Sequence, residues 1–201
     1  MKLLIATHNK AKLHEIKEFL VDTQHDLVSL SDLKISQDVD EDGLTYEQNS
    51  QKKALFYSQL SGLPTISDDG GLEISALNGV PGVRSRRWLG YAASDEELIE
   101  HLKKVSQQLP EDDRSAKFVT VVTLAIQNGR MWSKRSEING VIAKIPLENK
   151  TEGFPYRSFF FLPKLNKFYH DSELSADENK KYNHRRSAVR SLIPILHDQI
   201  F

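Results

Sequence analysis

Residues 1–20, MKLLIATHNKAKLHEIKEFL, combine three short patterns in the order strand, loop, helix. Leu3–Ala6 is an apolar run, which predicts a buried strand. Leu13, Ile16 and Leu20 then recur at helical spacing, so a helix follows after a polar loop. The loop Thr7–Lys12 therefore lies at a helix N-terminus, where backbone N–H groups favour anions.

Two further helices are predicted from their ends. Thr45 and Gln48 have the spacing of a capping box, and Gly62 is placed to end the helix that follows. Ser94 and Glu97 form a second capping box at the start of another helix. The second of these helices carries no candidate site residue, so we expect it to be structural.

Strands are predicted in the middle of the chain. Thr65–Ser67 reads as a brief strand that delivers Asp68–Gly71 into a loop. Phe118–Ile126 is β-branched and apolar, and Asn128–Gly129 is a hairpin turn that returns the chain. Pro194 should kink or split an amphipathic C-terminal helix. Helices and strands alternate early and strands cluster later, which predicts an α/β protein with a mixed sheet and flanking helices.

Composition excludes several classes of protein. The 201 residues contain 27 Lys and Arg against 28 Asp and Glu, so a net charge of −1 gives no global attraction to nucleic acid or anionic lipid. Because there is no cysteine, thiolate metal sites and cysteine nucleophiles are absent. No apolar run suits a signal peptide or a bilayer span, and no linker or repeat divides the chain. We expect a cytoplasmic protein with a single domain over residues 1–201 and neither membrane nor nucleic-acid partners.

The first candidate site is the loop before the first helix. Its residues are Thr7, His8, Asn9, Lys10, Ala11 and Lys12. Hydroxyl, amide and ammonium groups beside free N–H groups form a cradle for phosphate oxygens. The alternative is an Asn cap with solvated lysines. The loop lacks the glycines of a Walker motif.

The second candidate site is acidic. It comprises Asp40–Asp42 and the run Asp68–Gly71. Carboxylate oxygens suit Mg²⁺, which completes its shell with water and substrate phosphates, and a nearby Asp could act as the base for a nucleophilic water. The alternative is that both clusters are solvated turns. Glycine after the acids favours a ligand, because it lets a backbone approach closely.

The third candidate site is basic and aromatic. Gly153–Arg157 and the later run Lys180–Arg186 offer aromatic faces for stacking on a base and cations for its edge. The alternatives are a core strand and a solvated helix start. A further group, Arg84–Arg87, could mark a nucleic-acid patch, although solvated arginines or a subunit contact fit a near-neutral chain at least as well.

Together these motifs resemble the Ham1/RdgB/inosine triphosphatase family of nucleoside triphosphate pyrophosphatases. The family patterns T-x-N-x-x-K, E-x-G-x-T, D-D-S-G, P-G-[IV]-x-S-x-R and S-H-R appear as Thr7–Lys12, Glu41–Thr45, Asp68–Gly71, Pro81–Arg87 and Asn183–Arg185. The resemblance implies an elongated α/β fold with two lobes around a substrate cleft, and usually a homodimer. It also implies Mg²⁺-dependent hydrolysis of a nucleoside triphosphate to the monophosphate and pyrophosphate, with Mn²⁺ as a possible substitute.

The candidate residues then take roles. Asp69 is the catalytic proton acceptor, and Glu41 and Asp69 hold metal, with Asp68 as a further candidate. The phosphate-binding residues are Thr7, His8, Asn9, Lys10, Ala11, Lys12, Lys53 and Gly70. The residues at the base are Phe154, Pro155, Tyr156, Arg157, Asn179, His184 and Arg185.

The chain departs from the family mainly at the base end. Arg157 stands where the motif G-F-G-Y-D-P has an acid, and Asn179 stands where the family has a lysine. The family prefers deaminated purines, and our hypothesis is that Arg157 changes this preference because a guanidinium only donates hydrogen bonds. The alternative is that Arg157 turns to solvent. The altered pocket also leaves open a second function, that of a nucleotide-binding or sensing protein with weak catalysis.

Overall fold

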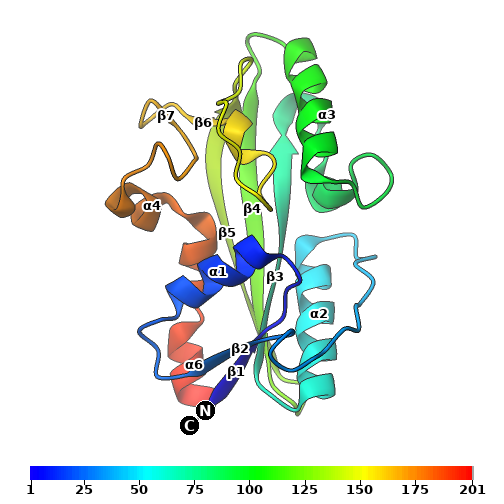
Figure 1. The fold of residues 1–201 in the computed structure, drawn as a ribbon, viewed down its shortest axis with the longest axis vertical. Coiled ribbons are helices and arrows are strands. Elements are labelled where there is room, and N and C mark those ends of the chain that lie inside the picture. Colours follow the sequence, from blue (N-terminus) through cyan, green and yellow to red (C-terminus); the bar gives the residue numbers. More distant parts are fainter. Residues whose placement is uncertain (201) are drawn as a thin grey trace. The chain divides into compact units, whose positions relative to one another are not determined.

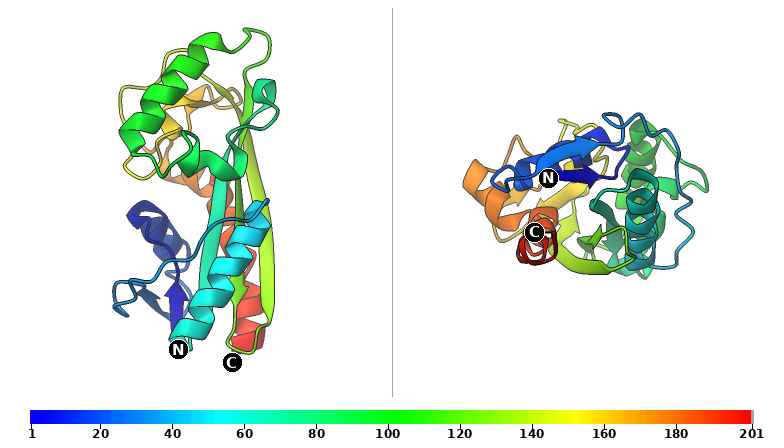
Figure 2. Two further views of the ribbon diagram at one scale, coloured as in Figure 1. Left: turned by 90° about the vertical axis from the view of Figure 1, so that its right-hand side faces the viewer. Right: turned by 90° about the horizontal axis from the view of Figure 1, so that it is seen from below.

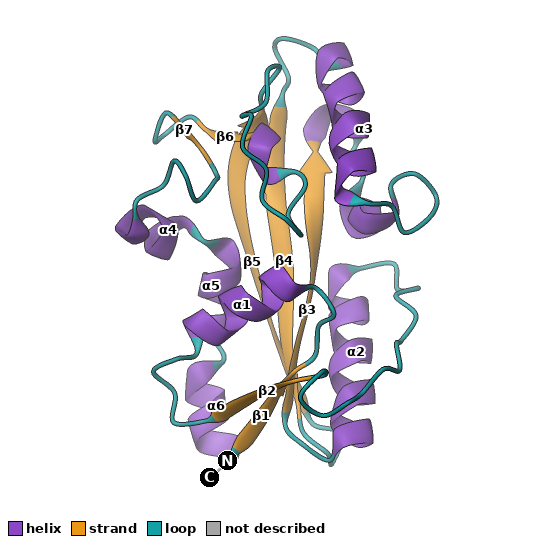
Figure 3. Cartoon of the chain, in the orientation of Figure 1, coloured by secondary structure: helices purple, strands orange, loops and turns teal. Residues whose placement is uncertain are grey.

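The structure is a computed structural model that describes residues 1–200 (Figure 1). Its strands are β1 (Lys2–Ile5), β2 (Asp26–Ser29), β3 (Thr65–Ile74), β4 (Ser115–Ala125), β5 (Met131–Ile142), β6 (Phe160–Leu162) and β7 (Lys167–Phe168). Its α-helices are α1 (Lys10–Phe19), α2 (Tyr46–Ser61), α3 (Asp95–Gln108), α4 (Ala176–Tyr182), α5 (His184–Arg190) and α6 (Ile193–Ile200), and short 3₁₀ helices include η2 (Gly82–Arg87) and η3 (Arg157–Phe159). Figure 3 shows these elements by type.

The strands form one mixed sheet in the order β2-β1-β3-β4-β5-β6-β7. Strand β1 pairs in parallel with β2 and β3, whereas β6 pairs antiparallel with β5 and β7. The predicted α/β class with a mixed sheet and flanking helices is therefore confirmed. No helix of the described residues has both the length and the apolar character needed to cross a membrane.

The chain divides into two compact units. Unit 1 comprises Met1–Asp69, Thr120–Ser136 and His184–Phe201, and unit 2 comprises Gly70–Val119 and Glu137–Asn183. Strands β3, β4 and β5 each contribute residues to both units. The predicted site residues are distributed over both units as well.

In unit 1, helices cover both faces of β1. Leu3 and Ile5 belong to a buried cluster with residues of α1, α5 and α6, whereas Leu4 and Ala6 belong to another with Tyr57 of α2. Successive residues of a strand point to opposite faces, so a strand between two helical layers is apolar at every position. Figure 2 shows α6 beside the hairpin end of β4 and β5.

The predicted helix ends are confirmed. Thr45 caps α2 by accepting a hydrogen bond from the Gln48 N–H at 3.2 Å, and Gly62 ends the helix in the left-handed region with φ of 70°. Ser94 and Glu97 form both hydrogen bonds of a capping box at the start of α3. In each case a short polar side chain or a glycine satisfies backbone groups that the helix leaves unpaired.

The hairpin turn and the helix break are confirmed too. The Gly129 N–H donates to the Ile126 carbonyl at 2.9 Å, and Gly129 has φ of 87°, which glycine adopts without strain. Helix α5 ends at Arg190 and α6 begins at Ile193, so Pro194 stands in the first turn of a new helix. There its missing N–H costs nothing.

The predicted loop at Asp68–Gly71 is wrong, because β3 continues without interruption from Thr65 to Ile74. A Cβ atom on Gly71 would lie 2.2 Å from Ser85 Oγ and 2.5 Å from the Gly82 carbonyl oxygen. Glycine is therefore required here by the close approach of η2 to the strand. The sequence pattern of two glycines does not distinguish this cause from a turn.

Unit 2 has its own apolar core. Leu98 and Leu102 of α3 belong to the same buried cluster as Ile138 and Ile142 of β5 and Phe159. The apolar face of α3 recurs at helical spacing, as the capping box at its start led us to expect. Helix α3 and residues of β3, β4, β5 and β6 thus form the core that holds the loops of unit 2 that carry the residues predicted at the base.

Candidate functional site

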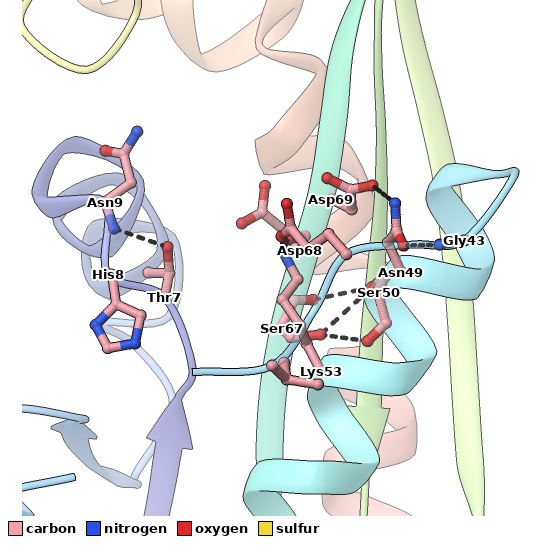
Figure 4. A network of polar contacts seen from close by, with 12 residues as sticks. Thr7, His8, Asn9, Gly43, Asn49, Ser50, Lys53, Ser67, Asp68 and Asp69 are labelled. Atoms are coloured by element: carbon pink, nitrogen blue, oxygen red, sulfur yellow. Dashed lines mark hydrogen bonds and ion pairs between the residues drawn. The ribbon is translucent and has the colours of Figure 1, made fainter. Parts of the chain in front are cut away.

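The first predicted site follows β1 and opens α1. Asn9 is the N-cap, and its Oδ1 accepts hydrogen bonds from the N–H groups of Ala11 and Lys12 at 2.9 and 3.1 Å. The Asn9 N–H in turn donates to Thr7 Oγ1 at 3.2 Å (Figure 4). His8 Nε2 lies 3.2 Å from the Tyr57 hydroxyl. The cap of the alternative interpretation is confirmed.

The lysines of this loop are not both solvated. Lys10 is exposed, but Lys12 Nζ lies 3.2 Å from Asp68 Oδ2 and only 17% of the Lys12 side chain is exposed. The first turn of α1 carries no acidic residue. Positive charge at this end of a helix is unfavourable next to the helix dipole. The first turn of α1 is therefore cationic, although a helix N-terminus favours acidic side chains.

Asp68 lies at the centre of a buried ion-pair network in unit 1. Its Oδ2 accepts from Arg185 Nε at 3.1 Å in addition to its contact with Lys12. Arg185 Nη1 donates to Glu15 Oε2 at 2.5 Å, and the Arg185 side chain is only 6% exposed. The network joins α1, β3 and α5. Arg185, predicted at the base, thus lies beside the acidic residues.

Asp69 is held by a residue that the sequence analysis missed. Asn49 Nδ2 donates to Asp69 Oδ2 at 3.1 Å, while Asn49 Oδ1 accepts from the Gly43 N–H at 2.8 Å (Figure 4). A Cβ on Gly43 would lie 2.6 Å from Asn49 Oδ1, so glycine is needed for this contact. A signal was present, because Asn49 and Lys53 stand four residues apart and share one face of α2.

Lys53 brings the two acidic segments together. Its Nζ donates to Glu41 Oε1 and, at 2.7 Å, to the Asp68 carbonyl oxygen. Burial alone would lower the pKa of Lys53, but the charges of Asp69, Glu41 and Asp68 outweigh burial and raise it. Lys53 is therefore a fixed cation at the acidic cluster.

The pKa values of the two neighbouring aspartates are displaced in opposite directions. Burial raises the pKa of Asp69, and the charge of Glu41 adds to this against the attraction of Lys53 and Lys12. Burial acts on Asp68 too, but Lys12 and Arg185 outweigh it and hold the pKa of Asp68 well below its usual range. Adjacent carboxyl groups whose pKa values are shifted in opposite directions are typical of a site in which one group is a fixed anion and the other a proton acceptor.

The donor set for a metal is small. Among the described residues, no group of three or more His, Cys, Asp or Glu side chains is arranged around a common point. Asp68 Oδ1 is nevertheless buried without a hydrogen-bond partner in the part of the chain that the structure describes. Glu41 and Asp69 add carboxylate oxygens that lie within electrostatic reach of each other, and Lys53 links Glu41 to the Asp68 backbone. Such a set fits a hard cation that takes one or two carboxylates and completes its shell with other oxygens.

The aromatic residues predicted at the base lie in unit 2. Phe154 is half-buried, whereas Pro155 and Tyr156 are buried. The Tyr156 hydroxyl donates to the Ser85 carbonyl at 2.6 Å, and its ring packs edge-on to Trp88. Tyr156 thus belongs to the core of unit 2 and supports the loop from inside.

Arg157 does not turn to solvent, so that alternative is wrong. Its side chain is 5% exposed, and its Cζ lies 3.7 Å from the centre of the Phe154 ring. It also lies 5.2 Å from the Tyr169 ring centre and forms an ion pair with Asp171 at 3.7 Å. A guanidinium that is buried among these partners gains cation–π and ionic stabilisation for its lost hydration.

The remaining predicted residues fall in both units. Asn179 of α4 accepts a hydrogen bond from Asn183 Nδ2 at 3.3 Å in unit 2. His184 begins α5 in unit 1 and is buried, at 6% exposure. Gly70, predicted at the phosphates, is a strand residue of β3 and the first residue of unit 2. The basic run is therefore not a solvated helix start at His184.

A mixed sheet between helical layers, with a polar cluster beyond the carboxyl end of β1, defines an α/β protein with a site in the usual place for ligands of this class. The chain belongs to the Ham1 family, whose model matches residues 3–195.

Comparisons with individual proteins agree with this family. The chain is 34% identical over 197 residues to the dITP/XTP pyrophosphatase of Desulforamulus reducens, covering 98% of this chain and 96% of that protein. It is also 34% identical to the dITP/XTP pyrophosphatase of Thermus thermophilus, covering 98% and 93%. Among solved structures, the HAM1 protein of Coxiella burnetii has a TM-score of 0.83 at 30% identity, covering 98% of this chain and 99% of that one. The Ham1 protein of Staphylococcus aureus has a TM-score of 0.81 at 31% identity.

Proposed function

We propose that the protein is a nucleoside triphosphate pyrophosphatase that hydrolyses non-canonical purine nucleoside triphosphates, such as those of inosine and xanthosine, to the monophosphate and pyrophosphate. Relatives at 34% identity over almost the whole chain carry the name dITP/XTP pyrophosphatase. The single observation that carries the proposal is a pair of adjacent buried carboxyl groups beside a cationic helix start. Asp68 is paired with Lys12 and Arg185, whereas Asp69 contacts the Asn49 amide. The cationic helix start suits an anionic substrate, and one of the two carboxyl groups can act as the proton acceptor.

The phosphate end of the substrate binds at the start of α1 in this proposal. Lys10 and Lys12 stand at a helix terminus that prefers anions, and a triphosphate relieves the unfavourable placement of their charges. Thr7 adds a hydroxyl, and Lys53 adds a buried ammonium group. Asn9 holds the turn in place through its Oδ1, which accepts two N–H groups, and its Nδ2 group is the part of the side chain that can donate to a phosphate.

Asp69 accepts the proton of the attacking water. A buried carboxyl group with a raised pKa is a better base than an exposed one, because its pKa lies closer to the working pH. Asn49 fixes the orientation of Asp69 through one oxygen. Asp68, held as an anion by Lys12 and Arg185, keeps these cations in place at the phosphates. Pyrophosphate then leaves from the α-phosphorus.

A divalent cation, Mg²⁺ by our proposal with Mn²⁺ as a substitute, fits oxygens of Glu41 and Asp69, with Asp68 Oδ1 as a further donor. When bound it neutralises phosphate charge and lowers the pKa of a coordinated water. Lys53 forms an ion pair with Glu41 in the protein alone, so its ammonium group balances this carboxylate before the cation binds.

Phe154 offers the stacking surface for the base in this proposal, since it is half-buried while Tyr156 is in the core. Aromatic stacking holds any base and does not by itself distinguish purines. Base choice therefore depends on polar groups around this ring.

The test is a panel of ITP, XTP, dITP and the canonical triphosphates with Mg²⁺, in which pyrophosphate and orthophosphate are measured separately. We expect pyrophosphate from the inosine and xanthosine nucleotides and much less from ATP. In water labelled with ¹⁸O, attack on the α-phosphorus puts the label into the monophosphate. Label in the pyrophosphate or release of orthophosphate would contradict the proposed reaction, and tight binding without product would favour the sensing function.

The family resemblance also implies a cytoplasmic homodimer, which we keep as part of the proposal. Light scattering at micromolar concentration tests it, because a dimer has twice the 22.9 kDa of one chain. A mass of one chain across the concentrations used for activity would contradict it.

A further inference from the structure

We propose that Asp171 determines which bases the protein accepts, and that Arg157 is a positioning residue that holds Asp171 and Phe154 in place. This inference rests on the proposed function, since it assigns a residue to the base of that substrate. It replaces our sequence-based hypothesis that the Arg157 guanidinium itself contacts the base. Asp171 is not part of any motif quoted above.

The first step is the placement of Arg157. Its side chain is 5% exposed, so the face of Phe154 that it covers is the inner face. The guanidinium plane lies in contact with this ring at 3.7 Å from Cζ and near Tyr169 at 5.2 Å. A buried group between two rings supports them, and it lies too deep to contact a ligand at the surface.

The second step is that donors converge on one carboxylate. Arg157 Nη1 lies 3.7 Å from Asp171 Oδ1, and Asn179 Nδ2 donates to the same oxygen at 3.5 Å. Asn183 Nδ2 donates to Asn179 Oδ1 at 3.3 Å, which orients the Asn179 amide with its N–H groups toward Asp171. The two departures from the family pattern, Arg157 and Asn179, thus serve one acid.

The third step is that the loop of Asp171 is held on both sides. His170 is buried, and its Nε2 lies 2.8 Å from Thr151 Oγ1. Its Nδ1 accepts from the Ser172 N–H at 3.1 Å, so the ring is in the form that carries its proton on Nε2. The Asp171 side chain between these anchors is nevertheless 57% exposed. A fixed backbone with an exposed carboxylate is suited to contact a ligand.

The fourth step is the chemistry of the base. Arg157 contacts both the Phe154 ring and Asp171, so the exposed carboxylate lies within one side chain of the ring on which we propose that the base stacks. A carboxylate only accepts hydrogen bonds. Purines with an oxygen on C6 carry a proton on N1, whereas adenine has a lone pair there. Asp171 therefore favours 6-oxopurines and repels the N1 edge of adenine.

The experiment separates binding from turnover. Dissociation constants for ITP and ATP are measured by calorimetry in full-length protein with Asp69→Asn, with and without Asp171→Asn. An amide at position 171 can donate to N1 of adenine, so we expect the preference for ITP over ATP to fall at least about tenfold. Asp177→Asn is the matched control, because Asp177 is another exposed aspartate of unit 2, in the first turn of α4.

A second variant distinguishes positioning from direct contact. If Arg157 acts through Asp171, Arg157→Gln lowers the preference in the same direction, and the double variant Arg157→Gln/Asp171→Asn loses no more than either single one. A preference that Asp171→Asn leaves unchanged overturns the inference, whether or not Arg157→Gln lowers it. The exposed Asp171→Asn variant is expected to fold even if Arg157→Gln does not. Turnover of ITP by unmodified protein is measured alongside, and its absence would contradict the proposed function while the affinities still decide the role of Asp171.

Discussion

The acidic cluster of unit 1 and the Arg157 cluster of unit 2 both pair an arginine with an aspartate, but they bury different partners. In unit 1 both Asp68 and Arg185 are buried, at 0% and 6% side-chain exposure. In unit 2 Arg157 is buried at 5%, whereas Asp171 is 57% exposed. A carboxylate enclosed by cations is part of the fold, and a carboxylate held at the surface by a buried cation remains available to a ligand.

The two clusters should differ in how much the free energy of unfolding falls when the aspartate is replaced. A buried charge is tolerated only with its partners, and removal of one partner leaves the other uncompensated. Where the carboxylate is exposed, as in Asp171, water solvates it and the pair contributes less, about 0–1 kcal/mol. Substitution should therefore damage stability in unit 1 and ligand choice in unit 2.

The largest expected effect is on turnover. Asp69→Asn removes the proton acceptor while the Asn49 amide keeps a neighbouring oxygen to donate to, so we expect kcat to fall about 10²–10⁴-fold with Tm within about 2 °C of the parent. Pyrophosphate release and thermal unfolding measure the two quantities. Wild-type kcat in this variant would remove Asp69 from the mechanism.

The next effect is on the stability of unit 1. Asp68→Asn leaves Arg185 and Lys12 without their shared anion, and we expect a loss of about 3–5 kcal/mol in the free energy of unfolding. Trp132 lies in unit 1 and the chain has one other tryptophan, Trp88, in unit 2. Urea unfolding followed by Trp132 fluorescence in a Trp88→Phe background therefore reports on unit 1.

Asp171→Asn is the matched control, and because Asp171 lies in unit 2 its unfolding is followed by Trp88 fluorescence in a Trp132→Phe background. It removes an equal charge from an arginine partner, but Asp171 is exposed and Arg157 keeps its contacts with the Phe154 and Tyr169 rings, so we expect a loss below about 1 kcal/mol. Equal losses in the two variants would mean that the contrast between the clusters has no energetic basis.

The sequence predicted the elements whose causes are local. Asn9 and Thr45 cap the starts of helices and Gly62 ends one, all through contacts within a few residues, and each was found where the pattern predicted it. Gly71 was misinterpreted because the reason for it is Ser85, which lies fourteen positions away and approaches only in the folded chain.

The candidate site follows the same division. Asp68, Asp69 and Lys53 are brought together as the motifs predicted, since they lie on adjacent β3 and α2. Asn49 was missed although it shares a helix face with Lys53. Asp171 could not be found from sequence, because its link to Arg157 depends on the packing of a loop.

The third expected effect is on the stability of unit 2, where β3 continues through Gly71 instead of ending in the predicted loop. Gly71→Ala places a Cβ against Ser85 Oγ and the Gly82 carbonyl, and overpacking of this kind costs about 1–3 kcal/mol. Gly71→Ser adds another atom and should cost more. Trp88 fluorescence during urea unfolding in a Trp132→Phe background reports on unit 2. A Gly71→Ala protein as stable as its parent would show that η2 can move away from β3.

The smallest expected effect concerns pH and the loop that carries Asp171. Burial lowers the pKa of His170. The Ser172 N–H donates to His170 Nδ1, so protonation of Nδ1 would remove this acceptor. Because the unfolded histidine has a pKa of about 6.5, the folded state binds fewer protons below this pH, so this part of the stability is complete above pH 6.5 and is lost as the pH falls.

His170→Asn keeps an acceptor for Ser172 but does not titrate, and its Tm should fall less between pH 7.5 and pH 5 than that of the parent, by at most about 3 °C. His25 of unit 1, whose pKa burial also lowers, contributes equally to both proteins and cancels in the difference. If the parent and the variant lose the same Tm over this range, His170 does not couple the loop to pH. If the preference for ITP over ATP also weakens at pH 5 in the parent but not in the variant, the fixed loop is what presents Asp171 to the base.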